Sequence, residues 1–108
     1  MARDFVREQL GDLGENTLQT VLLVSTELVT NAVLHGRGPI DLSVEVNASS
    51  VLVRVFDYEP REPQLREPDV DRTDGRGIAL VAMVSRRWGT SSHDGGKSVW
   101  AIIDRTAA

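Results

Sequence analysis

The hydrophobic period of this sequence changes at one point, from that of a helix to that of a strand, and this change limits the folds open to the chain. Residues Glu15–His35 carry apolar side chains on more than one face of a helix, which predicts a long and largely buried helix. A segment with two glycines and a proline, residues 36–39, ends that helix. Residues 40–46 then alternate apolar and polar side chains, which is the period of a strand. A buried helix therefore leads directly into a sheet.

The rest of the chain extends this pattern to an α+β domain. Turn residues at 47–50 and at 93–96 each separate two segments of strand character, so we expect two antiparallel hairpins. The expected elements are helices at 3–13, 15–35 and 75–85 and strands at 40–46, 51–56, 87–92 and 97–104. Helices and strands in this order predict a two-layer α/β sandwich, in which a mostly antiparallel sheet carries its helices on one face.

Length and composition exclude several classes of function. The chain has 108 residues, which suits one domain over residues 1–108. It contains no cysteine and only two histidines, so any metal is expected to be an oxygen-liganded magnesium ion. A net charge of -4 argues against direct nucleic-acid binding. Apolar runs too short for a bilayer and a charged N-terminus predict a cytoplasmic protein without a membrane span. Eleven of the 12 basic residues are arginine, and we draw no function from this bias.

Two polar residues within the buried helix are candidates for chemistry. Glu27 and Asn31 lie four positions apart, so their side chains share one helix face. An amide oxygen is a suitable magnesium ligand beside phosphate oxygens, and a carboxylate can act as a general base. The alternative is a core hydrogen bond or a solvent-facing edge. Spacing alone does not decide between these interpretations.

Two further candidates lie at the ends of elements. Asp57 follows the second strand and is either a turn residue or a carboxylate facing a cleft. Gly75, Arg76 and Gly77 precede or open a helix, where backbone N–H groups can bind phosphate oxygens, although glycines are common at such junctions. Between them, about residues 59–77, a segment rich in proline and charge is expected to form a lid loop, or otherwise a solvated surface loop.

Two other motifs are rejected as functional sites. Gly96-Lys97-Ser98 resembles the end of a phosphate-binding P-loop, but the residues that follow predict a strand where a P-loop requires a helix. His35 is expected to be a C-terminal helix residue that interacts with the helix dipole. No Ser/His/Asp hydrolase arrangement stands out in the sequence.

Taken in order, the motifs resemble one family. The stretch Glu27-Leu28-Val29-Thr30-Asn31-Ala32-Val33-Leu34-His35, then Asp57, then Gly75-Arg76-Gly77, resembles the GHKL (histidine-kinase-like) ATPase superfamily, whose ATP-binding domain has the Bergerat fold. The short length and the ending from Arg87-Trp88-Gly89 to Gly96-Lys97-Ser98-Val99-Trp100 are similar to bacterial anti-sigma-factor serine/threonine kinases. The resemblance covers nearly the whole chain.

The resemblance implies a role for each candidate residue. Glu27 would be the catalytic base, and Asn31 would coordinate Mg²⁺ on the phosphates of ATP. Asp57 would accept a hydrogen bond from the adenine amine, with Ser98 assisting. Residues Gly75, Arg76 and Gly77 would close the lid on the phosphates. The cofactors implied are ATP and Mg²⁺.

The resemblance also implies partners, and the sequence departs from the family at two places. The expected function is transfer of the ATP γ-phosphate to a serine of an antagonist protein, together with sequestration of a sigma factor. A non-catalytic ATP-binding interaction module is the alternative. The family motif Asp-x-Gly-x-Gly is replaced here by Asp57-Tyr58-Glu59-Pro60-Arg61. The N-terminal strand that supports dimerisation in similar proteins is not evident in the sequence, which leaves a homodimer an open expectation.

Overall fold

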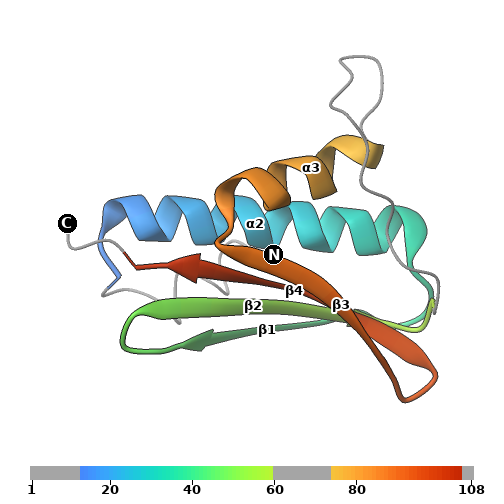
Figure 1. Cartoon of the computed structure of the whole chain (residues 1–108). Helices are drawn as coiled ribbons and strands as arrows, with labels where there is room; N and C mark the ends of the chain where they lie inside the picture. Colours follow the sequence, from blue (N-terminus) through green and yellow to red (C-terminus); the bar gives the residue numbers. More distant parts are fainter. Residues whose placement is uncertain (1–12, 60–73, 106–108) are drawn as a thin grey trace.

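A computed structural model describes residues 13–59 and 74–105, with side chains from residue 77 onward in the second range. Two helices pack on one face of a four-stranded antiparallel sheet, which confirms the predicted α+β sandwich (Figure 1). The helices are α2 (Glu15–His35) and α3 (Asp74–Val84), and the strands are β1 (Asp41–Val46), β2 (Ser50–Asp57), β3 (Arg87–His93) and β4 (Gly96–Asp104). Residues 3–12 of the helix expected over 3–13, and most of the expected lid, lie outside the described residues.

The sheet is built from two hairpins joined side by side. Its strand order is β1-β2-β4-β3, so β2 and β4 form the centre and every neighbouring pair is antiparallel. Asp94 and Gly95 both have positive φ, at 52° and 79°, which is the backbone of the two-residue turns that match strand twist. The predicted hairpin turn between β3 and β4 is therefore confirmed.

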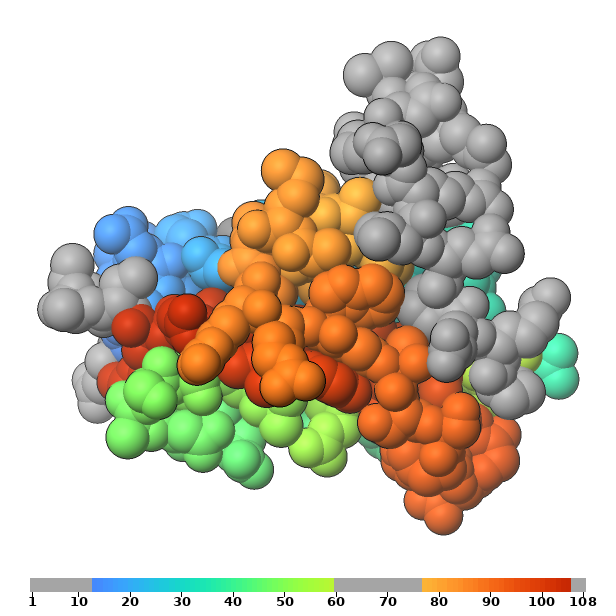
Figure 2. Space-filling view, in the orientation of Figure 1, coloured from blue at the N-terminus to red at the C-terminus, as the bar shows by residue number. Residues whose placement is uncertain are grey.

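The core lies between the helices and the inner face of the central strands. Alternate residues of β2 and β4 point toward α2, because side chains alternate across a strand. The fully or nearly fully buried apolar residues are Val21, Leu22, Val24 and Leu28 of α2, Val51, Val53 and Val55 of β2, Ile78 and Val81 of α3, and Val99, Ala101 and Ile103 of β4. In the space-filling view, α3 and β3 in orange occupy the middle of one face, with β4 in red beside the green β1–β2 hairpin (Figure 2).

Helix α2 is long and apolar enough to pass a length-and-hydropathy test for a membrane span, with a mean hydropathy of 1.3. Buried helices of folded domains pass the same test. In this structure Val21, Leu22, Val24, Leu28 and Ala32 of α2 belong to the buried core, whereas Leu23, Val33 and Leu34 are exposed.

Candidate functional site

Glu27 and Asn31 lie on the same side of α2, one turn apart, as the sequence predicts. Asn31 is only 9% exposed, and Glu27 is partly buried. Neither side chain has a hydrogen-bond partner among the residues that the structure describes. Buried amides in folded proteins are normally hydrogen-bonded. The core hydrogen bond considered as the alternative for this pair is not formed with any residue that the structure describes, and the ligand roles of Glu27 and Asn31 stay predictions.

Helix α3 approaches this pair through a glycine. A Cβ at Gly77 would lie 2.9 Å from Oε2 of Glu27, so a hydrogen in place of a side chain lets α3 pack beside the carboxylate. Gly75, Arg76 and Gly77 all fall in the first turn of α3, which begins at Asp74. The structure thus brings the predicted phosphate-binding segment next to the predicted base, although the Arg76 side chain lies outside the described part.

Asp57 ends β2 and is buried, with 1% of its surface exposed. The backbone N–H of Glu59 donates to its Oδ1 over 2.7 Å. A Cβ at Gly36, the residue that caps α2, would lie 2.8 Å from the Asp57 Cγ. The N–H of Tyr58 also donates to the carbonyl of Arg37 over 2.7 Å. The C-terminal end of α2 and the end of β2 are therefore held in direct contact.

The strongest partner of Asp57 is a residue to which the sequence motifs gave no role. Lys97 is the cross-strand neighbour of Asp57, and its Nζ donates to Oδ1 over 3.0 Å and to Oδ2 over 3.1 Å. The third Nζ proton goes to the Glu59 carbonyl over 2.8 Å. Lys97 is 3% exposed, so this is a buried ion pair. Strand alternation places Lys97 on the same face as Val99 and Ala101, but both faces of β4 are apolar, so the sequence did not identify this face as the inward one.

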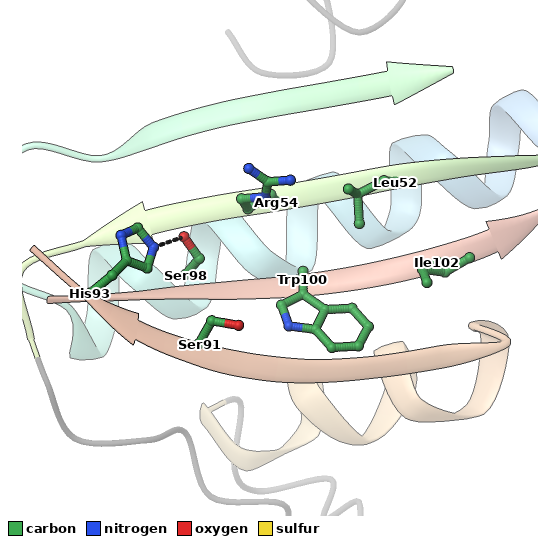
Figure 3. Close-up of a pocket in the computed structure, with 7 residues that line it drawn as sticks. All are labelled: Leu52, Arg54, Ser91, His93, Ser98, Trp100 and Ile102. Carbon is green, nitrogen blue, oxygen red and sulfur yellow. Dashed lines mark hydrogen bonds between the residues drawn. The ribbon is translucent and has the colours of Figure 1, made fainter. Parts of the chain in front are cut away.

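Ser98 lies on the opposite face of the sheet from Asp57. It pairs across the strands with Phe56, and its hydroxyl is hydrogen-bonded to Nε2 of His93 at 2.8 Å. The role predicted for Ser98 in adenine recognition stays a prediction, but the position beside Asp57 belongs to Lys97. Together with residues of β2, β3 and β4, Ser98 lines a shallow pocket of about 420 Å³ on the outer face (Figure 3).

Ser98, His93 and Asp94 also form a hydrogen-bonded chain, because Oδ2 of Asp94 lies 3.1 Å from Nδ1 of His93. The order of groups is that of a hydrolase triad. Ser98 is 2% exposed, however, and a nucleophile must be reached by its substrate. We therefore interpret these hydrogen bonds as a structural link between the β3–β4 turn and the sheet, and not as a hydrolase triad.

The candidate site residues form two groups at different positions along α2. Helical rise places Glu27 and Gly36 about 14 Å apart, so Glu27 and Asn31 mark one end and Asp57 with Lys97 the other. In Figure 1 the C-terminal end of α2, the end of β2 and the start of α3 all lie toward the right-hand side. Among the described residues no cluster of three acidic or histidine side chains could hold a metal. Asn31 could supply one ligand to Mg²⁺, which commonly takes its other ligands from phosphates and water.

Comparison with known proteins shows the family and the fold of the chain. The family model described as "Histidine kinase-like ATPase domain" matches residues 1–103. Among solved structures, the histidine kinase AdeS of Acinetobacter baumannii is similar, with a TM-score of 0.58 over 94% of this chain and 15% sequence identity. This chain spans 62% of the length of that structure, and such low identity shows the fold alone. No curated protein matches. Because the family model covers nearly the whole sequence, the chain belongs to the histidine-kinase-like ATPase domain family, the superfamily expected from its motifs.

Proposed function

We propose that this ATP-binding domain is a protein serine kinase that phosphorylates a small antagonist protein and sequesters a sigma factor when the antagonist is absent. The observation that carries the kinase activity is the Glu27–Asn31 pair. Both polar side chains lie on α2 without a partner among the described residues, and Gly77 holds α3 against the Glu27 carboxylate. The sigma factor and the antagonist come from the resemblance of the motifs to anti-sigma-factor kinases. A cytoplasmic location is part of the same proposal.

The chemistry assigns one task to each side chain. Mg²⁺, when bound, neutralises charge on the phosphates, and the Asn31 amide oxygen would hold it. The Glu27 carboxylate accepts the proton of the substrate serine hydroxyl as that oxygen attacks the γ-phosphorus. The bond between the γ-phosphorus and the β-γ bridging oxygen breaks, and ADP leaves with the electron pair. Phosphoserine, ADP and a protonated Glu27 result.

Two other functions have support. The fold similarity to AdeS, a histidine kinase, favours transfer to a histidine of a partner. The replacement of the usual Asp-x-Gly-x-Gly by Asp57-Tyr58-Glu59-Pro60-Arg61 favours a non-catalytic ATP-binding module. A non-catalytic module transfers no phosphate from ATP to a protein. The two kinases differ in their product, because phosphoserine is stable in acid and phosphohistidine is not.

The test combines binding with transfer. Mg-ATP at about 100 times its dissociation constant should stabilise the domain by roughly 2.7 kcal/mol, which thermal melting detects. The domain is then incubated with γ-labelled ATP and the antagonist-like proteins encoded near its gene. We expect an acid-stable phosphoserine on one of them and no transfer by Glu27→Gln, which should still bind ATP because the amide keeps its shape.

The matched control is Thr30→Ala, an exposed residue of the same helix, which should transfer phosphate like the wild type. An acid-labile, base-stable product would indicate a phosphohistidine and refute serine specificity. Binding of ATP without transfer to any candidate, with an active reference kinase in the same assay, would favour the interaction module. Full activity in Glu27→Gln would remove Glu27 from the role of base.

A further inference from the structure

Lys97 stands out because the chain uses lysine nowhere else. Eleven of the 12 basic residues are arginine, and the single lysine is one of the least exposed charged residues, at 3%. An ammonium group is a compact charge with three donors, whereas a guanidinium is a broad, planar fork. The space between β4 and the end of β2 therefore holds an ammonium group, which is smaller than the guanidinium group of arginine.

The three donors of Lys97 match three acceptors. Two are the carboxylate oxygens of Asp57, and the third is the Glu59 carbonyl, all within 3.1 Å. The ammonium group is thus fully satisfied by the protein. Glu59 stands where the family motif usually has its first glycine, and it accepts this bond through its backbone carbonyl, a group that a glycine carries as well.

Asp57 is occupied to a similar extent. A carboxylate offers about four acceptor sites, and here one takes the Glu59 N–H and two take the Lys97 ammonium. Gly36, at the end of α2, packs against this carboxylate so closely that a Cβ added there would lie 2.8 Å from the Asp57 Cγ. The charge of Asp57 is also balanced within the protein. A purine amine therefore gains little from this carboxylate while Lys97 holds it.

We propose that Lys97 sets the base selectivity of the nucleotide site by holding Asp57, so that the domain discriminates only weakly between purines with and without a 6-amino group. The inference rests on the nucleotide binding of the proposed function and adds a property that the motifs do not predict. Binding then depends mainly on the triphosphate end of the site, near Glu27 and Asn31. A purely structural ion pair would leave base selectivity unaffected by changes at Lys97.

The experiment measures Kd by isothermal titration with Mg²⁺ for three ligands. These are ATP, GTP and purine riboside triphosphate, which lacks the 6-amino group. The wild-type chain should bind all three within about threefold of one another, because Lys97 already balances the charge of Asp57 and contacts both of its oxygens. Lys97→Met should bind ATP about tenfold or more tightly relative to the other two, since Asp57 becomes a free acceptor, and tenfold corresponds to about 1.4 kcal/mol.

Three further variants complete the test. The double variant Lys97→Met/Asp57→Asn removes both charges and should return the three Kd values to within about threefold. Lys97→Gln keeps a donor near Asp57 without the charge, and should prefer ATP in the same direction but less strongly. It serves as the second variant where Lys97→Met does not fold. Ser91→Ala, an exposed residue of β3, is the control and should keep wild-type ratios.

The outcomes distinguish a failure of the selectivity proposed for Lys97 from a failure of nucleotide binding itself. A wild-type preference for ATP of about tenfold or more would show that the amine reaches Asp57 despite Lys97, and would overturn the proposal. Unchanged ratios in folded Lys97→Met or Lys97→Gln would also overturn it and leave a structural ion pair. No binding of any triphosphate by the folded wild type would refute the proposed function itself and, with it, this inference.

Discussion

The buried ion pair between Asp57 and Lys97 makes a specific prediction for stability. Lys97→Met keeps most of the apolar stem and removes the ammonium group. The Asp57 carboxylate, 1% exposed, then loses the partner that contacts both of its oxygens. The Glu59 carbonyl loses a donor as well. Removing one partner of a buried pair costs about 3–5 kcal/mol, mainly because a charge is left buried without compensation.

This loss is large for a domain of this size. Small domains have unfolding free energies of about 5–15 kcal/mol, and each kcal/mol lost lowers Tm by roughly 4–8 °C. Urea or guanidinium unfolding at 25 °C, followed by circular dichroism, should therefore show a markedly lower midpoint with an unchanged slope. The double variant Lys97→Met/Asp57→Asn should recover much of the loss, since neither remaining group is charged.

The surface pair of Arg86 and Asp104 is the matched control. Its atoms lie 3.5 Å apart, and both side chains are 62% exposed. Exposed pairs contribute about 0–1 kcal/mol, so Asp104→Asn should change the free energy of unfolding by less than about 1 kcal/mol. If Lys97→Met cost no more than Asp104→Asn, or if the double variant were less stable than Lys97→Met, the reasoning from burial and pairing would be refuted.

Three further changes test the site. Asn31→Ala should reduce the thermal stabilisation by Mg-ATP by more than half while changing stability without ligand only slightly, and equal stabilisation would remove Asn31 from the metal site. Gly77→Ala adds a Cβ within 2.9 Å of the Glu27 carboxylate, so phosphoryl transfer should fall about tenfold or more with the fold retained; normal transfer rates would contradict this. Gly36→Ala brings a Cβ against the Ala32 carbonyl and the Asp57 carboxyl carbon, and should cost about 1–3 kcal/mol in denaturant unfolding; a neutral change would show that the α2 end relaxes.

Local patterns predicted the secondary structure well, because hydrophobic period and turn residues are local signals. Helix α2 has the predicted bounds Glu15–His35, and its ends coincide with Gly14 and Gly36. Helix α3 begins and ends one residue earlier than expected, at Asp74 and Val84. The proximity of Glu27 and Asn31 followed in the same way, since residues four apart on a helix must share a face.

The other end of the site depended on tertiary structure. Asp57 and Lys97 are 40 residues apart, and they meet only because β2 and β4 pair in the register that sets Asp57 opposite Lys97. The sequence of β4 is apolar on both faces, with Val99 and Ala101 on one and Trp100 and Ile102 on the other. Strand alternation alone therefore does not say which of Lys97 and Ser98 points inward.

The sequence by itself determined the elements between Glu15 and Asp104, their order, the family and the polar pair on α2, because these follow from local spacing and short motifs. Only the tertiary structure decided that Lys97 faces Asp57, that Ser98 faces His93, and that Gly36 and Gly77 lie against carboxylates. The physical reason is that strand order, register and the face of each side chain arise from long-range pairing and from burial on the helical side of the sheet, neither of which is encoded in neighbouring residues.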